Sequence, residues 1–485
     1  MGHTLATLTD GTALHSSEHA RIDVKGLTAD SRAVQQGFVF AALKGSATDG
    51  RKFIPKAIEA GASAILTDTA PGDVPSNVAF LLDDNPRQRL AEMAARLFPR
   101  QPDHIVAVTG TAGKTSVATF ARQLFSALGC HAASLGTVGV QIGEELKYGN
   151  LTTPDPVTLH QILDEIAGEG VTHLAMEASS HGLDQYRLDG VKLSAAGFTN
   201  LGRDHLDYHG TMDAYLTAKL RLFEDLLPPD GTAVFNADCD EAAAIASIVE
   251  RRGLRAIPIG KAGTGIQIKD IRDNAFKQIV EIDGALGSHN VTVPFVGRFQ
   301  VMNALIAAGL TVAAGCDPHD VFTAVETLKG AKGRLERIGM TESGANIIID
   351  YAHKPDALRE VLIALRPFTT GRLISVFGAG GDRDPGKRPI MGAVSKEFAD
   401  VTIVTDDNPR TEDPATIRKA ILDSAPSALE IGDRAEAIAH AASIAGQGDT
   451  ILIAGKGHEP GQIIGTETIP FSDHDVAGEF VAHQS

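Results

Sequence analysis

Cysteine is scarce in this chain of 485 residues, which contains only Cys130, Cys239 and Cys316. The three are widely separated and show no CxxC spacing, so the sequence predicts neither a zinc site nor a disulfide framework. We expect each of them to be an isolated small core residue in a reducing compartment.

Basic residues and long apolar runs are also lacking. The chain has 44 Lys and Arg against 61 Asp and Glu, a formal net charge of −17, and a field of that sign repels nucleic acid and anionic membranes. No apolar stretch approaches the length of a membrane span, and the first twenty residues lack the basic start and apolar run of a signal peptide. We expect a cytoplasmic protein that binds no nucleic acid and does not insert into a membrane.

What the sequence does contain is an alternation of short apolar runs with helical patterns, typical of an α/β fold. Its length suggests about three domains, which we place at 1–100, 101–337 and 338–485. The first carries strand-like runs at Phe38–Ala41 and Ala64–Leu66 and a helical pattern at Phe53–Ala60. Two prolines in the turn-rich stretch Phe98–Asp103 mark its end. The second opens with the apolar strand Ile105–Val108 and is expected to form a parallel sheet.

The third segment repeats the alternation compactly, with helices expected near Asp356–Leu365 and Pro389–Phe398. Its predicted strands are Asn346–Asp350, Leu373–Phe377, Val401–Thr405 and Ile451–Ala454. They are followed by the polar tails DYAH, GAGGDRD, DDNPR and GKGHE. Because the carboxyl ends of parallel strands line one crevice, we expect the four tails to converge on a ligand site.

The strongest local motif follows the strand Ile105–Val108. It consists of Gly110, Thr111, Ala112, Gly113, Lys114, Thr115 and Ser116, and apolar residues at helical spacing come next. A strand, a glycine-rich turn and a helix N-terminus together cradle phosphate. Lys114 is expected to reach the terminal phosphates, and the hydroxyl of Thr115 or Ser116 to bind Mg²⁺. The alternative is a plain strand-to-helix turn with a surface lysine.

A second glycine-rich turn, Gly378–Gly381, invites a dinucleotide interpretation. It has Arg383 where the GxGxxG pattern requires glycine, and no acidic residue is clearly placed for a ribose, so NAD is disfavoured.

Carboxylates and imidazoles gather after two further strands of the middle segment. The apolar run Val171–Met176 ends in Glu177, where a second Mg²⁺ ligand is expected beside a phosphate loop. The loop Leu201–Gly210 is dense in His and Asp, which fits metal or substrate contact but also ordinary surface polarity. Lys219, taken alone, has the pattern of a solvated helical lysine.

A series of motifs that occur in a fixed order along the chain changes the interpretation of these residues. GTAGKTS, MEASSHGLDQYR, NLGRDHLDYHG, AYLTAKLRLF, GRFQVMNALIA, GRLE, DYAHKPDAL, GAGGDRDPGKRP, DDNPR and GKGHE follow one another between about residues 22 and 475. In this the chain resembles the Mur ligases. The resemblance implies an N-terminal α/β UDP-binding domain, a central P-loop ATPase-like parallel sheet and a C-terminal Rossmann-like domain.

The resemblance also implies an activity, namely ATP-dependent addition of an amino acid, here meso-2,6-diaminopimelate, to a UDP-linked muramoyl dipeptide. The expected partners are these small molecules, and a monomer is favoured. The implied cofactors are Mg²⁺, with two ions expected, and a CO₂-derived carbamate on Lys219. A free ε-amine is cationic at neutral pH and repels Mg²⁺, whereas a carbamate binds it.

By resemblance, the site residues fall into groups. ATP is expected at the phosphate loop and at Asn303, Arg334 and His353. Metal ligands are expected at Thr115, Ser116, Glu177, His205 and carbamylated Lys219, and the catalytic group at Lys114, Glu177, His205 and Lys219. The UDP-linked precursor is expected at Ser31, Ser46, Ala47, Thr48, Thr152, Thr153, Ser179, Gln185 and Arg187. Diaminopimelate is expected at Arg383, Asp407, Asn408, Pro409, Arg410, Gly455 and Glu459.

Arg410 distinguishes between substrates. Diaminopimelate differs from lysine by a second carboxylate, which an Arg fork grips bidentately, and lysine-adding relatives lack arginine here. Folylpolyglutamate synthetase shares the phosphate loop, but the LTADSR segment around Ser31 argues against it. A non-catalytic nucleotide-binding scaffold is the alternative from another class, and the presence of the catalytic group disfavours it. Ala112 and Gln300 stand where the family usually has asparagine.

Overall fold

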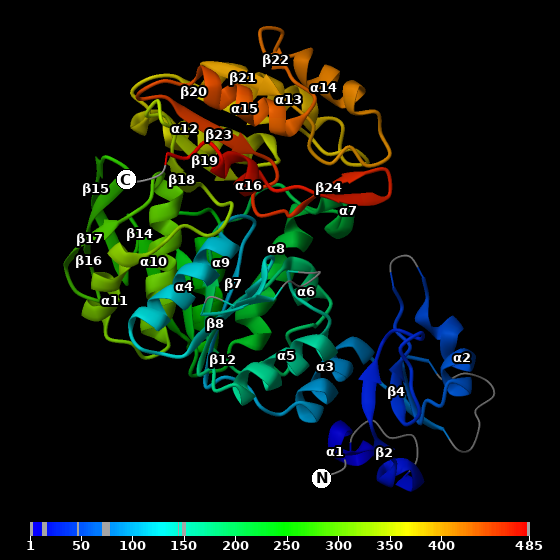
Figure 1. Ribbon diagram of the computed structural model, residues 1–485. Helices are drawn as coiled ribbons and strands as arrows, with labels where there is room; N and C mark the ends of the chain where they lie inside the picture. The colour runs from blue at the N-terminus through cyan, green and yellow to red at the C-terminus, as the bar shows by residue number, and fades with distance from the viewer. Residues whose placement is uncertain are drawn as a thin grey trace. The chain divides into compact units, whose positions relative to one another are not determined.

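A computed structural model of the chain describes residues 3–11, 17–45, 48–69, 78–143, 145–147 and 152–482. Two compact units are present. The first comprises Met1–Ile268, Asp283–Ser288 and Leu305–Ala324, and the second comprises Lys269–Ile282, His289–Ala304 and Val325–Ser485. Figure 1 labels the helices and strands along the chain. Among the described residues, no helix combines the length and apolar character needed to cross a membrane.

The first unit begins with a four-stranded parallel sheet. Its order is β3 (Gly26–Thr28), β4 (Phe38–Ala41), β5 (Ala64–Thr67) and β6 (Ala79–Leu82). Successive side chains of a strand point to opposite faces, so one face packs on α1 (Leu5–Thr9) and α3 (Pro86–Leu97) and the other on α2 (Ile54–Glu59). A short ribbon, β1 (His3–Thr4) with β2 (Asp23–Val24), precedes it. The predicted strands are confirmed, and the predicted helix is α2 after a 3₁₀ turn at Gly50–Phe53.

A larger sheet of eleven strands follows, with strand order β10-β9-β8-β11-β7-β12-β13-β14-β15-β16-β17. The bounds are β7 (His104–Thr109), β8 (Ala132–Gly136), β9 (Gly139–Ile142), β10 (Glu145–Lys147), β11 (His173–Glu177), β12 (Leu193–Phe198), β13 (Thr232–Asn236), β14 (Arg255–Gly260) and β15 (Ile266–Asn274). The strands from β8 through β11, β7, β12 and β13 to β14 pair in parallel, as expected.

The sequence analysis did not predict the antiparallel pairs of this sheet, in which β9 pairs antiparallel with both β8 and β10. Only Thr137 and Val138 separate β8 from β9. A connection that short joins antiparallel strands, whereas a parallel pair needs a crossover of a dozen residues or more.

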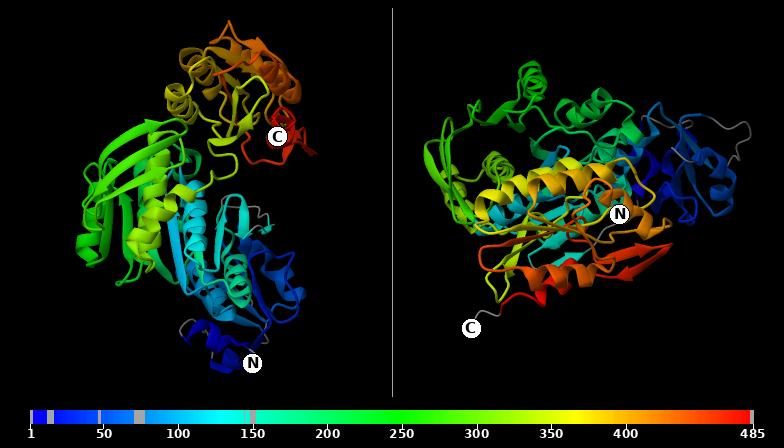
Figure 2. Two further views of the ribbon diagram at one scale, coloured as in Figure 1. Left: turned by 60° about the vertical axis from the view of Figure 1, so that its left-hand side comes forward. Right: turned by 90° about the horizontal axis from the view of Figure 1, so that it is seen from above.

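Helices cover both faces of this sheet, as Figure 2 shows. α4 (Lys114–Ala127) packs on β7, β8 and β11. On the other face, Ile105 and Ala107 join a core with α5 (Pro156–Gly168), α6 (Ser180–Asp184), α9 (Ala242–Arg252) and the π-helical turn Leu222–Leu226. Three further helices are α8 (Met212–Arg221), α10 (Arg298–Ala313) and α11 (Pro318–Ala324).

The segment Leu201–Gly210, expected to be a loop, contains the short helix α7 (Leu206–His209). Its His and Asp residues masked the helical turn in the sequence. Left-handed backbone at His205 (φ 51°) precedes the helix, and Gly210 (φ 76°) ends it.

The second unit is built on a six-stranded sheet of order β18 (Glu336–Met340), β19 (Asn346–Asp350), β23 (Thr450–Ala454), β20 (Leu373–Phe377), β21 (Val401–Val404) and β22 (Leu429–Glu430). All pairs are parallel except β18 with β19. A separate antiparallel pair consists of β24 (Gly461–Ile464) and β25 (Glu467–Pro470), whereas β16 (Lys277–Asp283) and β17 (His289–Val293) pair antiparallel at the end of the eleven-stranded sheet.

Each strand of the six-stranded sheet contributes to two cores, because alternate residues face opposite ways. Ile348, for example, packs with α12 (Pro355–Leu365), α13 (Lys387–Phe398) and α14 (Pro414–Leu422). Its neighbours in β19 pack with α15 (Arg434–Ile444) and α16 (Asp473–Gly478). The strands and helices predicted for this segment are confirmed to within two residues at each end.

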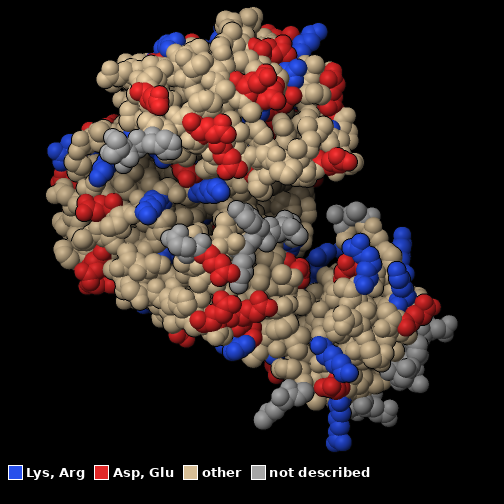
Figure 3. Space-filling view, viewed as in Figure 1, with Lys and Arg blue, Asp and Glu red and all other residues tan. Residues whose placement is uncertain are grey.

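The three cysteines are free thiols, but they are half-buried rather than core residues. Acidic side chains are spread between basic ones over the face shown in Figure 3.

Candidate active site

The phosphate loop connects β7 to α4, with Gly113 as the left-handed residue (φ 87°) before the helix. The ammonium of Lys114 donates hydrogen bonds to the carbonyl oxygens of Gly110 at 2.8 Å and Thr111 at 3.1 Å. Thr115 and Ser116 occupy the first turn and are buried. The loop therefore wraps around the side chain of Lys114. The backbone N–H groups at the start of the helix are available to bind an anion.

Residues from the end of β12 hold this loop. Thr199 Oγ1 donates to Ala112 O at 2.6 Å, and Asn200 Oδ1 accepts from Ala112 N at 3.0 Å. Gly110 has φ 146°, and a Cβ added there would lie 1.9 Å from Thr199 Oγ1. Only glycine fits this position, since both the backbone conformation and the space exclude a side chain.

Lys219 is buried, with 1 % of its surface exposed, so its reading as a solvated lysine is wrong. Helix α8 directs it inward, where its Nζ donates to Gly110 O at 2.8 Å and lies 4.3 Å from the centre of the Tyr215 ring. Burial, with a smaller contribution from the charge of Lys114, lowers the pKa of Lys219 to about 6. The structure therefore contains a neutral amine nucleophile beside the phosphate loop at physiological pH.

Glu177 ends β11 and is 1 % exposed. Its carboxylate accepts from Thr137 N at 2.8 Å and from Thr137 Oγ1 at 3.1 Å. In the described part of the chain no cation forms an ion pair with it. A buried carboxylate without a cation is costly, which fits a bound metal ion better than a purely structural role.

His205 lies just before α7 with 46 % of its side chain exposed, and Asp204 Oδ2 is 3.4 Å from its Nε2. Around it lie the rings of His181, Tyr208, His209 and Tyr215, with centroids 4.1 to 6.2 Å apart in successive pairs. No group of three or more His, Cys, Asp or Glu among the described residues has the arrangement of a metal site by itself.

Residues predicted for the muramoyl-peptide portion form a connected network around Glu177. Thr153 Oγ1 donates to Glu177 O at 3.1 Å and accepts from Ser179 N at 3.1 Å. Arg187 donates to Thr153 O at 2.6 Å and to Gln185 Oε1 at 2.8 Å. Thr152 Oγ1 lies 3.0 Å from Thr137 Oγ1, the threonine that also bonds to Glu177. The structure brings these five predicted residues together.

Among the residues predicted for the uridine end, Ser31 is half-buried and Thr48 is exposed. Ser46 and Ala47 lie outside the described residues.

The remaining predicted ATP residues belong to the second unit. Asn303 Nδ2 donates to Gln300 Oε1 at 2.9 Å, and Gln300 Nε2 donates to Arg334 O at 3.2 Å. Gln300 thus links Asn303 to Arg334. The Arg334 guanidinium lies 4.5 Å from the centre of the Tyr351 ring, which is in edge contact with His353. Burial lowers the pKa of His353 to about 4, so this imidazole is neutral at physiological pH.

The four polar tails of the second unit meet at the carboxyl edge of its sheet, as expected. Gly455 N donates to Asp350 O at 3.1 Å, and Gly381 N donates to Asn408 O at 2.9 Å. Asn408 Nδ2 donates to Glu459 Oε2 at 2.9 Å. These bonds join residues up to about a hundred positions apart, and the convergence follows from the parallel strands.

The DDNPR tail contains two features typical of a binding site. Asp407 is 7 % exposed, and its Oδ2 has no hydrogen-bond partner among the described residues. Arg410 has left-handed backbone (φ 51°), which is uncommon outside glycine, and Nη1 donates to Gly381 O at 2.9 Å. A strained residue and a buried carboxylate oxygen without a partner among the described residues, both within one short tail, point to a ligand. Pro409 and Gly455 are buried beside them, whereas Arg383 is exposed.

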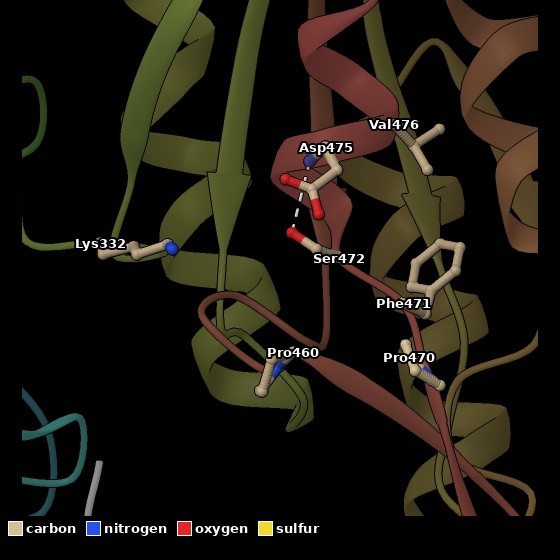
Figure 4. A pocket seen from close by; sticks show the side chains of 7 residues that line it. All are labelled: Lys332, Pro460, Pro470, Phe471, Ser472, Asp475 and Val476. Atoms are coloured by element: carbon tan, nitrogen blue, oxygen red, sulfur yellow. Dashed lines mark hydrogen bonds between the residues drawn. The ribbon is translucent and has the colours of Figure 1, made fainter. Parts of the chain in front are cut away.

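A hollow of about 390 Å³ lies next to this region and is shown in Figure 4. Lys332 lies across it from Ser472 and Asp475, whose N–H donates to Ser472 Oγ at 3.3 Å. None of the predicted site residues lines it.

Several residues of the site escaped the sequence analysis. Thr137 on the hairpin turn bonds to Glu177, and Thr199 and Asn200 hold the phosphate loop. Tyr215 shields the amine of Lys219. The only sequence signal for them was their place after a strand or within a quoted motif.

Family models match this chain in three successive segments. The Mur ligase family, catalytic domain, matches residues 23–101, the Mur ligase middle domain matches 108–311, and the Mur ligase, glutamate ligase domain, matches 333–457. The chain belongs to the Mur ligase family, whose members are ATP-dependent ligases.

Among its relatives is a protein of Bradyrhizobium diazoefficiens named UDP-N-acetylmuramoyl-L-alanyl-D-glutamate–2,6-diaminopimelate ligase, 54% identical over 467 residues and 96% of each chain. A protein of the same name from Caulobacter vibrioides is 50% identical over 458 residues, 93% of this chain and 94% of its own. A solved structure of that name superposes with a TM-score of 0.75 at 33% identity and covers 99% of each chain.

Proposed function

We propose that this chain joins meso-2,6-diaminopimelate to the γ-carboxylate of the D-glutamyl residue of UDP-N-acetylmuramoyl-L-alanyl-D-glutamate, at the expense of ATP. The observation that carries the proposal is the combination in one unit of a phosphate loop, a buried neutral Lys219 and a buried Glu177 that forms no ion pair among the described residues. Relatives about half identical over nearly the whole chain are named for this reaction, which supports the choice of substrates.

ATP binds, in this proposal, with its terminal phosphates at residues 110–116 and its remainder at Asn303, Arg334 and His353. Lys114 supplies positive charge to the phosphates, and the N-terminus of α4 adds partial positive charge. Thr152, Thr153 and Ser179, with Gln185 and Arg187, hold the muramoyl dipeptide. Ser31 and residues 46–48 hold its uridine end.

Glu177, His205, the hydroxyls of Thr115 and Ser116 and a carbamate on Lys219 fit Mg²⁺, with two ions proposed. All of these donors except the His205 nitrogen are oxygens, which suit this hard cation, and no cation among the described residues balances the charge of Glu177. Bound Mg²⁺ would neutralise charge on the transferring phosphoryl group.

The reaction needs activation because an amine does not displace oxide from a carboxylate. A γ-carboxylate oxygen attacks the γ-phosphorus of ATP, the bond to ADP breaks, and an acyl phosphate forms. The amine of diaminopimelate then attacks the acyl carbon, loses a proton, and expels inorganic phosphate. Lys114 stabilises charge in both steps, so the protein contributes mainly positioning and electrostatics.

Lys219 is proposed to carry the carbamate. Only a neutral amine adds to CO₂, and the lowered pKa supplies that form. The carbamate product is an anion, whose oxygens would attract Mg²⁺ where the neutral amine carries no charge to do so.

The amino acid is proposed to bind at Arg383, Asp407, Asn408, Pro409, Arg410, Gly455 and Glu459. Arg410 would grip the distal carboxylate that lysine lacks, while the unpaired oxygen of Asp407 suits an ammonium group.

We also propose the domain bounds 1–100, 101–337 and 338–485, a cytoplasmic location that fits a nucleotide-linked precursor, and a monomer.

Formation of ADP tests the function. Purified protein with ATP, Mg²⁺ and the UDP-linked dipeptide should release ADP when meso-diaminopimelate is added, and much less with L-lysine at equal concentration. Preference for L-lysine would favour the lysine-adding alternative. ATP binding with no precursor-dependent ADP would indicate a nucleotide-binding scaffold and refute the proposal.

A further inference from the structure

Lys456 is a fully buried lysine beneath the proposed amino-acid site, and neither the motif assignments nor the proposed mechanism uses it. It follows β23 in the tail GKGHE and has 0% of its surface exposed. A buried ammonium is tolerated only where its donors are all matched. Here Nζ donates to Gly461 O at 2.6 Å, to Glu459 Oε2 at 3.0 Å and to Asn408 Oδ1 at 3.2 Å. Each of the three N–H groups of the ammonium therefore has one acceptor.

These acceptors belong to two pieces of chain, the tail of β21 and the stretch that runs from Lys456 into β24. Asn408 lies in the tail of β21, Glu459 in the tail of β23, and Gly461 begins β24. The same junction is reinforced by Ile463 N, which donates to Asn408 Oδ1 at 2.9 Å. Lys456 therefore fixes the path of its own stretch between β23 and the β24-β25 hairpin and joins that stretch to the tail of β21 through Asn408.

The contacts also fix which atoms face a ligand. Asn408 Oδ1 accepts from Lys456 and Ile463, while its Nδ2 donates to Glu459 Oε2. The amide is thus held in one orientation. Glu459 Oε2 accepts twice, so its other oxygen is the one left for a substrate group. A carboxylate and an amide fixed in this way are arranged in advance for recognition.

We propose that Lys456 is a positioning residue for the incoming amino acid: through Asn408 and Glu459 it holds both binding tails in the conformation that receives the amino and carboxyl groups of the diamino acid. The inference rests on the proposed function and adds to it a residue that does not touch substrate. It predicts a defect in amino-acid binding that spares the phosphoryl-transfer step, because the phosphate loop belongs to the other unit.

The test compares Lys456→Met, which keeps the length and apolar stem but removes the ammonium, with wild type and with Lys396→Met, an exposed lysine of the same unit. We expect KM for meso-diaminopimelate to rise roughly 10- to 100-fold, in line with the loss of charged hydrogen bonds. The KM values for ATP and precursor and the exchange of ¹⁸O within ATP, measured with precursor and without amino acid, should stay within about twofold. Lys396→Met should match wild type throughout.

A double variant, Lys456→Met with Glu459→Gln, separates positioning from general damage. If Lys456 acts through Glu459, the double variant should be little worse than Glu459→Gln alone, whereas independent effects multiply. If Lys456→Met does not fold, Lys456→Gln, which keeps a donor but no charge, is measured by the same criteria.

The proposal is overturned by an unchanged KM for the amino acid, by an equal rise in all three KM values, by loss of the isotope exchange, or by multiplying effects in the double variant. Failure of the proposed function itself would be visible separately, as wild-type protein without precursor-dependent exchange.

Discussion

Lys219 gives the sharpest prediction, since its burial changes its chemistry. Its ammonium form is disfavoured first by removal from water and then by Lys114, whose amine bonds to the same carbonyl oxygen, Gly110 O. The experiment supplies CO₂ to the protein and measures its reaction with Lys219. We expect the lysine to be carbamylated at neutral pH, whereas ordinary lysines remain ammonium ions.

The magnitude follows from the pKa of about 6 against an ordinary value of 10.5. At pH 7.5 roughly 97% of the Lys219 amines are neutral, compared with about 0.1% for an unperturbed lysine. The concentration of the reactive form is therefore about a thousandfold higher at this one position.

The assay is ¹³C NMR of the protein in ¹³C-bicarbonate. One equivalent of carbamate signal is expected at pH 7.5, declining as the pH falls through about 6. The signal should be absent in Lys219→Met, which should also release no ADP, and present in Lys192→Met, an exposed lysine of the same unit. A carbamate signal that arises only above about pH 9, or that persists in Lys219→Met, would refute the reasoning.

Stability in CO₂-free buffer provides an independent check with a definite sign. The folded pKa lies below the unfolded one, so between about pH 6 and 10.5 the unfolded chain holds a proton that the folded chain lacks. Wild-type stability should therefore rise with pH across this window, by up to about 1.4 kcal/mol per pH unit. Lys219→Met lacks this dependence, and its advantage over wild type in denaturant unfolding should be larger at pH 7 than at pH 9.

For three further substitutions, the structure determines the direction of the expected effect on binding, activity or stability. Gly110→Ala places a Cβ against Thr199 Oγ1 in a backbone conformation that disfavours side chains, and should weaken ATP binding roughly 10- to 100-fold in a titration with a fluorescent ATP analogue. Arg410→Ala should cost about 2–5 kcal/mol in kcat/KM for meso-diaminopimelate and much less for L-lysine, as measured by ADP release with each amino acid. Arg434→Met leaves the carboxylate of Asp473 unpaired in a site where both side chains are 0% exposed, and should destabilise the second unit by about 3–5 kcal/mol in denaturant unfolding.

Matched variants control these experiments. Gly129→Ala introduces a similar backbone strain (φ 84°) with nothing within 4 Å of the new Cβ, so ATP affinity should stay normal. Adding Asp473→Leu to Arg434→Met removes the unpaired charge and should restore part of the stability. Normal ATP binding in Gly110→Ala, an equal loss for both amino acids in Arg410→Ala, or no stability difference between the single and double variants would each contradict the corresponding argument.

Much of the architecture was predictable from the sequence, because buried parallel strands appear there as short apolar runs followed by polar residues. The run Ile347–Ile349 is buried on both faces of its strand, and the glycine-rich turn after Val108 is explained by local chemistry alone. The antiparallel strands β9 and β10 were missed, since β9 is mostly half-buried and follows the two-residue turn Thr137-Val138, which carries no strong turn signal.

The site was harder to predict where it depends on long-range packing. Nothing in the sequence around Lys219 indicates burial, because the groups that enclose it are Gly110 and Tyr215, one of them more than a hundred positions away. The resemblance to the Mur ligases identified Lys219 as a functional residue, whereas the helical pattern around it did not. Lys456 was overlooked for the same reason, as its partners come together only when β21 and β23 lie in one sheet.

The left-handed backbone of Arg410 limits how this protein's preference for an amino acid can evolve. A replacement must satisfy φ 51° as well as new chemistry, and among residues with side chains Asn and Asp adopt that conformation most readily. Val, Ile and Thr would bear an added conformational penalty before making any contact. Natural or engineered changes of selectivity at this position should therefore pass through a short list of small polar residues or glycine.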